Sequence, residues 1–500
     1  MAASVLEYLE RSASRFPEKE VYEDAFHAVT YGEVLDLSRR IGSALWNQIG
    51  APRHPVAVFM DKNVESVISF LGVLTCGGFY CPLDSKMPVE RIHTIMNVLK
   101  PDVVLTDRAH QAEAEVFAGA ARILIYEDVI GTEIQAEELA AVRRQCTESD
   151  PLYVLFTSGS TGVPKGVLVS HRVVTNYMEW LSETFDLGPE DVFGNQAPLY
   201  FDVSIHDIYG ALYFGAKMVI IPQEKFSFPV KLIEYLNEKR VSTFLWVPSA
   251  LCIVANLDTF QFAVPEHLKH IMFAGEVLPR KQLDYWRRYV PDAVYANLYG
   301  PTETFVCTAH IMDGTEPENE PLPIGVPVSN AQMLILTEDN RLAADGEVGE
   351  LCMRGSCLAL GYYSNPERTA QSFVQNPLND HYQDRIYHTG DLVRLNEKGQ
   401  LIYVSRKDFQ IKHMGYRIEL GEIETAAGLV DGVQDCACIY DARRQRIVLY
   451  YDGTEWEKKA MLEQLALRVP KYMIPGRVVH LDIMPHNANG KIDRKKLAEL

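Results

Sequence analysis

The chain has 500 residues, of which 47% are hydrophobic and 23% are charged, so it is long enough for at least two globular domains. Its 67 Asp and Glu residues against 48 Lys and Arg residues give a net charge of −19, which repels nucleic acid and excludes it as an expected partner. Nine cysteines without zinc or redox spacing, no export signal and no apolar run of membrane length predict a reduced, cytoplasmic setting without a membrane partner.

Short β-rich runs alternate with helix-like segments through the first half of the chain. Runs of apolar and β-branched residues predict strands at 56–60, 103–105, 217–221 and 243–247. Helical periodicity predicts helices at 63–75 and 229–239. Alternation of this kind is typical of layered α/β structure.

The pattern changes near Val326, where short strands separated by Gly-rich and Asn-rich turns indicate a smaller β-rich subdomain. After Asp408, amphipathic helices and strands alternate again and predict a small α+β unit. We therefore expect an α/β protein with two domains. A large N-terminal domain at 1–406 would combine layered α/β subdomains with the β-rich one, and a small mobile domain would occupy 407–500.

The segment at 155–166 reads Leu-Phe-Thr-Ser-Gly-Ser-Thr-Gly-Val-Pro-Lys-Gly and follows an apolar strand-like run. Glycines allow backbone N–H groups to approach phosphate oxygens, and the hydroxyls and Lys165 add donors and positive charge. It is not a Walker A loop, because that spacing is absent and the residues after Lys165 resemble a strand. A flexible hairpin turn is the alternative. The expected phosphate-binding residues besides Lys165 are Thr157, Ser158, Gly159, Ser160, Thr161 and Gly162.

Four further blocks accompany this loop, at 299–304, 387–391, 406–419 and 489–493. They read Tyr-Gly-Pro-Thr-Glu-Thr, Tyr-His-Thr-Gly-Asp, a segment from Arg-Lys-Asp to Gly-Tyr-Arg-Ile-Glu, and Asn-Gly-Lys-Ile-Asp. With these blocks in this order, the whole chain resembles the adenylate-forming superfamily of acyl-CoA synthetases, luciferases and peptide-synthetase adenylation domains. The resemblance implies an enzyme that uses ATP and Mg²⁺ to join a carboxylic acid to AMP.

The resemblance also assigns roles around the nucleotide. Thr302 would contact the α-phosphate and Glu303 would bind Mg²⁺, which prefers hard oxygen ligands. Tyr299 would lie against the adenine, with Asn297 at its edge, and Asp391 would accept hydrogen bonds from the ribose unless it is only a turn residue. The other residues assigned to the nucleotide are Gly275, Glu276, Gly300, Tyr403 and Arg406.

Lys491 is the catalytic residue expected first, with Lys165, Thr302 and Glu303 assisting. Its ammonium would offset the negative charge that develops as pyrophosphate leaves. By resemblance, Asp408 would be the hinge of a domain rotation. That rotation would withdraw Lys491 and present the segment containing Lys412 and Gly415 for the thiol step. The alternatives are a solvated surface lysine for Lys491 and a simple hairpin turn for Gly415.

Asp202 resembles the aspartate that amino-acid-activating members of the superfamily place against the substrate's α-ammonium. Fatty and aryl acids would leave this carboxylate unpaired, so a small amino acid is favoured. A helix cap is the alternative for Asp202. The expected lining residues are Val203, His206, Trp246, Met272, Ala274, Leu298, Val306 and Cys307. Trp246 is expected to narrow the pocket, and His206 to be a wall residue more than a polar contact.

The combination of Trp246 with Ala274, Leu298, Val306 and Cys307 resembles the pocket of stand-alone ligases that load L-proline onto a carrier protein. L-Proline is therefore the expected substrate, followed by D-alanine and then a small branched residue such as valine. The chain ends soon after Lys491, so we expect a separate phosphopantetheinylated carrier protein as acceptor, or else coenzyme A. A catalytically inactive regulatory protein is disfavoured, because Lys165, Glu303, Asp391 and Lys491 are all present.

Overall fold

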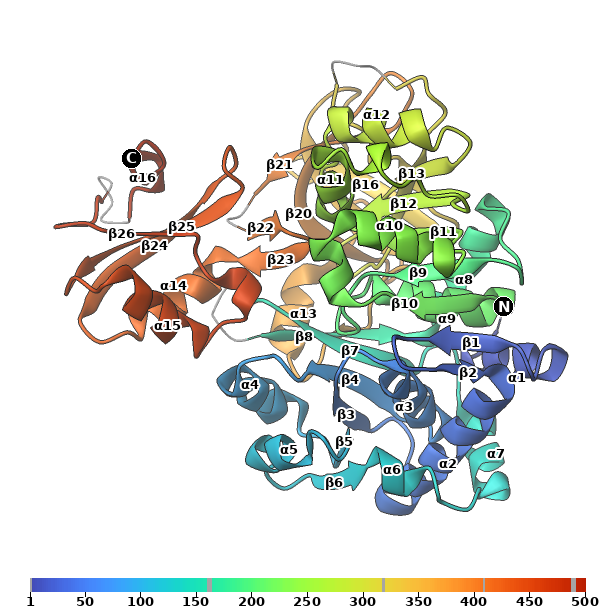
Figure 1. Cartoon of the computed structure of the whole chain (residues 1–500). Coiled ribbons are helices and arrows are strands. Elements are labelled where there is room, and N and C mark those ends of the chain that lie inside the picture. The colour runs from blue at the N-terminus through green and yellow to red at the C-terminus, as the bar shows by residue number, and fades with distance from the viewer. Residues whose placement is uncertain (1, 160–163, 317–319, 408–409, 487–491) are drawn as a thin grey trace. The chain divides into compact units, whose positions relative to one another are not determined.

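The computed structural model describes residues 2–159, 164–316, 320–407, 410–486 and 492–500 (Figure 1). Contacts between residues divide the chain into two compact units. The large unit comprises Met1–Ser85, Lys100–Leu155 and Val167–Ser405. The small unit comprises Lys86–Leu99, Phe156–Gly166 and Arg406–Leu500.

Helices and strands alternate along the large unit, and this confirms the predicted α/β class. The predicted domains at 1–406 and 407–500, and the mobility of the second, stay predictions. No helix in the part of the chain that the structure describes is both long and apolar enough to cross a bilayer. All nine cysteines are free thiols.

The largest sheet of the large unit has nine strands in the order β15-β14-β13-β12-β11-β9-β10-β1-β2. From β13 to β10 the neighbouring strands are parallel, so their carboxyl ends lie at one edge, where open α/β sheets bind ligands. The strands are β1 (Glu20–Glu23), β2 (Ala28–Thr30), β9 (Val192–Asn195), β10 (Lys217–Ile220), β11 (Thr243–Trp246), β12 (His270–Ala274), β13 (Val294–Tyr299), β14 (Thr308–Ile311) and β15 (Val326–Pro327).

Two sets of helices pack on this sheet. Leu232 of α10, Leu251 of α11 and Trp286 of α12 belong to one hydrophobic cluster, whereas α8 and α9 belong to another. The helices and short 3-10 turns are α8 (His171–Thr184), α9 (Ser204–Phe214), α10 (Pro229–Glu238), α11 (Pro248–Asn256), α12 (Arg280–Tyr289), η1 (Gln223–Ser227) and η2 (Thr259–Gln261). The strands predicted at 217–221 and 243–247 and the helix predicted at 229–239 are thus confirmed as β10, β11 and α10.

A second sheet has seven strands in the order β18-β8-β7-β4-β3-β5-β6. The strands are β3 (Pro55–Met60), β4 (Phe79–Asp84), β5 (Val103–Thr106), β6 (Arg122–Ile125), β7 (Pro151–Thr157), β8 (Lys165–Ser170) and β18 (Gly361–Tyr362). The accompanying helices are α1 (Leu6–Arg15), α2 (Tyr31–Ile49), α3 (Val64–Thr75), α5 (Gln111–Phe117), α6 (Tyr126–Val129) and α7 (Ala136–Gln145). The strands predicted at 56–60 and 103–105 and the helix at 63–75 are confirmed as β3, β5 and α3. The α3 helix begins where the Asn63 side chain accepts a hydrogen bond from the Ser66 amide, a standard N-cap.

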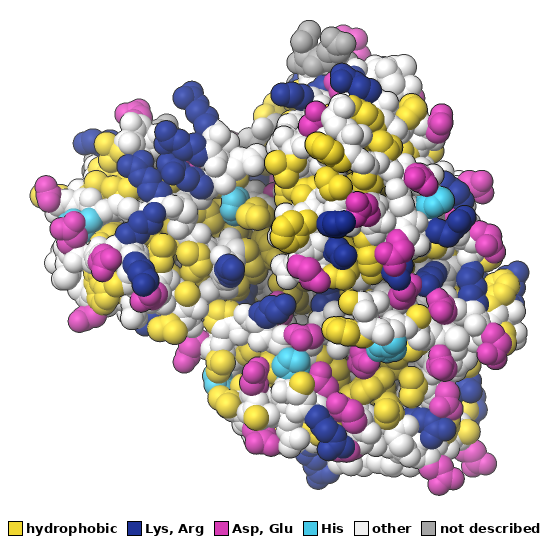
Figure 2. All heavy atoms as spheres, in the orientation of Figure 1, with side chains coloured by type: hydrophobic (Ala, Val, Ile, Leu, Met, Phe, Trp, Pro, Cys, Tyr) yellow, Lys and Arg dark blue, Asp and Glu magenta, His cyan; other side chains and the backbone are white. Residues whose placement is uncertain are grey.

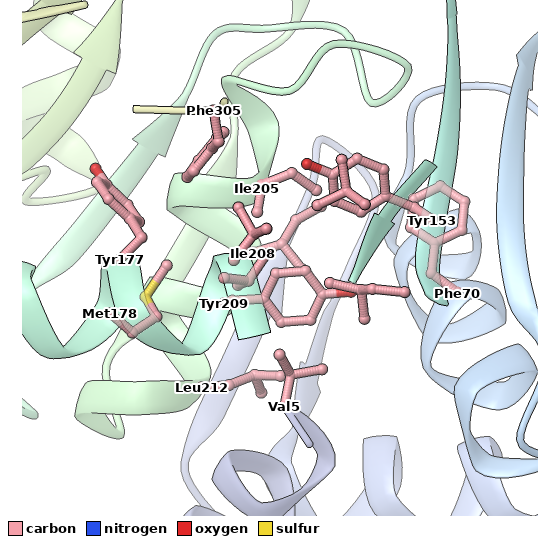
Figure 3. Close-up of a cluster of buried hydrophobic side chains, with 14 of the residues drawn as sticks. Val5, Phe70, Tyr153, Tyr177, Met178, Ile205, Ile208, Tyr209, Leu212 and Phe305 are labelled. Carbon is pink, nitrogen blue, oxygen red and sulfur yellow. The ribbon is translucent and has the colours of Figure 1, made fainter. Parts of the chain in front are cut away.

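Helix α9 is buried all round, as its mostly apolar sequence requires, since the residues from Ser204 to Leu212 are all buried. Figure 3 shows Tyr153 of β7 reaching toward Ile205, while Tyr177 of α8 lies on the other side of α9. A helix packed on several sides has little freedom to move. It therefore holds the residues before and within its first turn, Asp202 to His206, in a defined place.

A five-stranded sheet confirms the β-rich subdomain predicted from Val326 onward. Its strand order is β16-β17-β20-β19, and β21 pairs with β20. The elements are β16 (Ala331–Leu336), β17 (Gly349–Gly355), β19 (Phe373–Gln375), β20 (Arg385–Leu395), β21 (Leu401–Arg406) and α13 (Pro366–Ser372).

The small unit contains a hairpin and a three-stranded sheet, β24-β25-β26. Helices α14 and α15 contribute to one hydrophobic cluster of this unit, and Leu497 of α16 belongs to another. Helix α4, although it comes early in the chain, also belongs here, and its Arg91 forms a buried ion pair with Glu422. The elements are α4 (Val89–Leu99), β22 (Gln410–His413), β23 (Tyr416–Glu419), α14 (Leu420–Gly428), β24 (Val433–Asp441), β25 (Arg446–Gly453), α15 (Lys458–Ala466), η3 (Lys471–Met473), β26 (Arg477–His480) and α16 (Arg494–Ala498).

Candidate active site

A tight turn follows β13 and carries Thr302 and Glu303. The Cys307 amide donates to the Tyr299 carbonyl at 2.9 Å and closes the turn. A Cβ atom on Gly300 would overlap the carbonyl oxygen of Phe305, so the turn requires glycine at this position. Thr302 is half-buried and Glu303 is fully buried.

Distant residues hold both the side chain and the backbone of Glu303. The Tyr362 hydroxyl donates to Oε1 of Glu303 at 2.8 Å, and the Ala359 amide donates to the Glu303 carbonyl at 2.9 Å. The described residues include no cluster of three or more metal-ligating side chains. One fixed carboxylate nevertheless fits Mg²⁺, which usually binds one or two protein carboxylates together with water and substrate phosphates.

The side chains of Asp391 and Tyr299 are in contact within the large unit. Asp391 is buried, and the Tyr299 hydroxyl donates a hydrogen bond to its Oδ2. Burial and the Asp391 carboxylate hold the pKa of Tyr299 well above 10.0, so the phenol stays protonated and remains a donor. Asn297, two residues earlier on β13, donates to the Pro323 carbonyl at 2.8 Å. Tyr403 is half-buried on β21.

Gly275 and Glu276 follow the carboxyl end of β12. Gly275 has a φ of +98°, a conformation that glycine adopts readily. Oε2 of Glu276 accepts a hydrogen bond at 3.2 Å from the Ser249 amide at the beginning of α11. Glu276 is thereby tied to the same carboxyl edge of the sheet as Tyr299.

The structure describes only part of the predicted phosphate-binding loop. Lys165 begins β8, which confirms that a strand and not a helix follows the loop. Ser158 Oγ donates to the Arg417 carbonyl at 2.9 Å and accepts from the Glu419 amide at 3.1 Å, within the small unit. The Thr157 hydroxyl is buried and has no hydrogen-bond partner among the described residues. Gly159 is described, whereas Ser160, Thr161 and Gly162 lie outside the described residues.

Six of the expected lining residues belong to, or pack against, the extensive hydrophobic cluster of the large unit that includes α8 and α9. Ala274 and Leu298 are paired across β12 and β13, so their side chains share a face of the sheet. Met272, Ala274, Leu298, Val306 and Cys307 are buried members of this cluster, and the partly buried Val203 packs against it. Asp202 directly precedes Val203, the N-cap residue of α9.

Trp246 lies elsewhere, in contrast to the expectation that it narrows this pocket. Its indole stacks on Phe244 at a centroid distance of 4.0 Å and donates to the Gly194 carbonyl at 2.8 Å. It belongs to the second hydrophobic cluster, with α10, α11 and α12. The reason is strand alternation, since Leu245 pairs with Met272 on one face of the sheet and Trp246 pairs with Phe273 on the other.

His206 is fully buried in α9, with its Nδ1 2.7 Å from the Tyr177 hydroxyl. Burial, together with the smaller effect of the nearby His270, lowers its pKa from 6.5 to about 3, so the imidazole is neutral. The role of His206 as a wall residue of the pocket stays a prediction. No charged partner for a polar substrate is created here.

The residues expected in the thiol step lie in the small unit. Lys412 is on β22, and Gly415 is in the turn between β22 and β23. Met414 and Gly415 have φ values of +53° and +81°, as in a two-residue type I′ hairpin turn. Arg406 ends β21 and is half-buried. Lys491 and Asp408 lie outside the described residues.

Two residues at the site were not expected from the sequence, Tyr362 and Glu350. Tyr362 holds Glu303, and an oxygen of Glu350 accepts from the Gly390 amide next to Asp391 at 3.0 Å. Each contact joins residues 40 or more positions apart. No local pattern in the sequence signals such a pairing.

Comparison with known proteins identifies similar chains. The model of the AMP-binding enzyme family matches residues 9–363. An L-proline–(L-prolyl-carrier protein) ligase from Streptomyces coelicolor is 34% identical, over 94% of this chain and 91% of that protein. Tyrocidine synthase 3 from Brevibacillus parabrevis is 31% identical over 100% of this chain, which spans only 8% of that protein. The Vibrio cholerae adenylation domain AlmE, solved with glycyl-adenosine-5'-phosphate, has a TM-score of 0.84 at 22% identity, over 100% of this chain and 98% of that one.

The fold and the family match are those of an adenylate-forming ligase. The chain belongs to the AMP-binding enzyme family.

Proposed function

We propose that this enzyme activates L-proline with ATP as prolyl-AMP and transfers the prolyl group to the phosphopantetheine thiol of a separate carrier protein. The observation that carries the proposal is that the carboxyl end of β13 bears residues assigned to the amino acid as well as residues assigned to the nucleotide. Leu298, a lining residue, alternates there with Asn297 and Tyr299, which are assigned to the nucleotide. An amino acid and a nucleotide could therefore meet at the carboxyl edge of the sheet.

The lining residues support a small apolar substrate. Val203, Met272, Leu298 and Val306 are apolar, and the buried His206 is neutral. The Asp202 carboxylate would pair with the substrate's α-ammonium, including the secondary ammonium of proline. The proline-specific ligase of Streptomyces coelicolor, at 34% identity, supports the same choice.

In the first step, a carboxylate oxygen of the amino acid attacks the α-phosphorus, the bond to the departing pyrophosphate oxygen breaks, and pyrophosphate leaves. Glu303 would hold Mg²⁺, which supplies positive charge to the phosphates. Asp391 would accept from the ribose hydroxyls, and Asn297 and Tyr299 would position the adenine. Lys491 would stabilise the charge that develops, a role that rests on the resemblance and on the Asn-Gly-Lys sequence at 489–491.

In the second step, the carrier's thiol sulfur attacks the carbonyl carbon of prolyl-AMP, the bond to the AMP oxygen breaks, and the thiol proton passes to solvent. The products are a thioester and AMP. Lys412 and Gly415 would face this reaction after a rotation at Asp408, which is the proposed hinge between domains at 1–406 and 407–500.

The charge distribution supports an acidic protein as the partner. Residues 406–500 contain 16 Lys and Arg against 14 Asp and Glu, although the whole chain has 48 against 67. Figure 2 shows Lys and Arg side chains gathered over the part of the small unit that includes α16. A carrier protein, typically acidic, would be attracted to this region in spite of the overall charge of −19.

ATP–pyrophosphate exchange with a panel of amino acids tests the proposal. L-Proline should give the highest rate and glycine a low one, because burying proline's three side-chain methylenes contributes about 2 kcal/mol. A rate with D-alanine tenfold above that with L-proline would replace the prolyl assignment with D-alanine. Lys491→Ala should abolish exchange yet spare transfer from supplied prolyl-AMP, whereas equal loss of both steps in a folded variant would refute the role of Lys491.

A further inference from the structure

The segment from Thr389 to Asp391 forms an irregularity in β20. Glu350 of β17 pairs with Leu392, but Cys352, only two residues further along, pairs with His388. Strand β20 therefore contains extra residues at this place and bulges out of the ladder. Gly390 has a φ of +74°, which the bulge requires and which glycine accommodates. Bulges beside active sites commonly aim a side chain, here that of Asp391.

A bulge leaves backbone groups without partners in the ladder, and side chains replace those partners here. The Thr389 hydroxyl donates to the Leu351 carbonyl at 2.7 Å and accepts from the Asp391 amide at 3.0 Å. The Gly390 amide donates to Oε1 of Glu350 at 3.0 Å. Glu350 is thus the acidic side chain that holds the centre of the bulge.

The second oxygen of Glu350 is also engaged. Nδ1 of His388 lies 3.0 Å from Oε2 of Glu350 and 3.3 Å from Sγ of Cys352. Cysteine, histidine and glutamate together can form a nucleophilic triad, but that role does not fit this cluster. Cys352 is fully buried, and the thiol and the carboxylate meet the same ring nitrogen, so the histidine cannot relay a proton between them. The cluster instead orients the Glu350 carboxylate.

We infer that Glu350 is a positioning residue for nucleotide binding, which fixes the Gly390 amide and thereby aims the Asp391 carboxylate at the ribose, with His388 orienting Glu350. This inference rests on the proposed role of Asp391. Glu350 itself would not contact the nucleotide. Without it the bulge would lose the bond at Gly390, and the Asp391 carboxylate would sample several positions.

Isothermal titration with ATP, 2′-deoxyATP and 3′-deoxyATP tests this inference without requiring turnover. Wild-type protein should bind the deoxy nucleotides about 10-fold more weakly than ATP, because a hydrogen bond to the charged Asp391 is lost. Glu350→Ala should bind ATP about 10-fold more weakly than wild type and should discriminate little between ATP and the deoxy nucleotides. A purely structural role would lower the melting temperature but leave the discrimination ratio intact.

Matched variants separate charge from geometry. Glu350→Gln keeps an oxygen for the Gly390 amide and should retain most of the discrimination. Glu347→Gln is the control, because Glu347 lies three residues earlier, just before β17, and pairs with Arg341 at the surface. It should bind all three nucleotides as wild type does. Glu350→Asp, which is too short to reach both partners, provides the same test if Glu350→Ala does not fold.

The outcomes distinguish the inferred role of Glu350 from the proposed ribose role of Asp391. If wild type discriminates, Asp391→Ala does not, and folded Glu350→Ala keeps the wild-type ratio, the inference is overturned and the ribose role of Asp391 stands. If wild type itself binds ATP and the deoxy nucleotides equally, the ribose role is overturned, and the inference about Glu350 with it.

Discussion

His206 should make the large unit sensitive to acid. Its pKa is lowered to about 3 in the folded chain by burial, whereas an unfolded chain would give it a value near the ordinary 6.5. Between these two values the unfolded chain binds a proton that the folded chain does not. The contribution of a neutral His206 to the free energy of unfolding is therefore fully present above about pH 6.5 and is lost as the pH falls.

The size of this effect follows from the two pKa values. Each pH unit below about 6.5 costs about 1.4 kcal/mol for one such histidine, so the loss at pH 5.0 is about 2 kcal/mol. His206→Gln removes the titrating group while keeping a polar side chain near the Tyr177 hydroxyl. Other buried groups of the large unit also titrate, among them His171 with a pKa near 3 and Asp207 with a pKa near 7, but they remain in the variant and cancel in the comparison.

Urea unfolding at pH 7.5 and pH 5.0 measures the difference. Tryptophan fluorescence is a suitable signal, because four of the five tryptophans lie in the large unit and only Trp456 lies in the small one. Between these pH values His206→Gln should lose about 2 kcal/mol less than wild type. His381→Gln is the control, since that side chain is 88% exposed, and it should behave as wild type. Equal acid losses in His206→Gln and wild type would refute a neutral His206.

Three further changes test individual contacts at the site. Trp246→Ala should cost about 3–5 kcal/mol of unfolding free energy in urea without changing the order of preferred amino acids in exchange assays; a shift toward bulky amino acids would place the indole in the pocket after all. Tyr362→Phe should lower kcat/KM for ATP about 10-fold through the freed Glu303 carboxylate and leave KM for the amino acid unchanged, whereas equal changes in both would argue against this role. Gly300→Ala should abolish exchange, because its Cβ overlaps the Phe305 carbonyl, and wild-type exchange would contradict the turn described here.

Sequence reasoning located the features that depend on local patterns. Runs of β-branched residues predicted β3 and β11, and helical periodicity predicted α3, because periodicity acts over a few residues. The same holds for Gly300, since a turn that excludes a side chain requires glycine at one position. The candidate nucleotide residues Tyr299 and Asp391 also came from short motifs, and the structure brings their side chains into contact.

The sequence by itself thus determined the class of fold and the place of several elements in the chain, and it supplied candidate residues for the site. Only the tertiary structure decided which distant groups meet. Strand pairing placed Trp246 on the face opposite to Met272, and an antiparallel pair brought Glu350 to the Gly390 amide. Sheet faces and cross-strand contacts depend on the register between segments far apart in the chain, and no local pattern of residues contains that register.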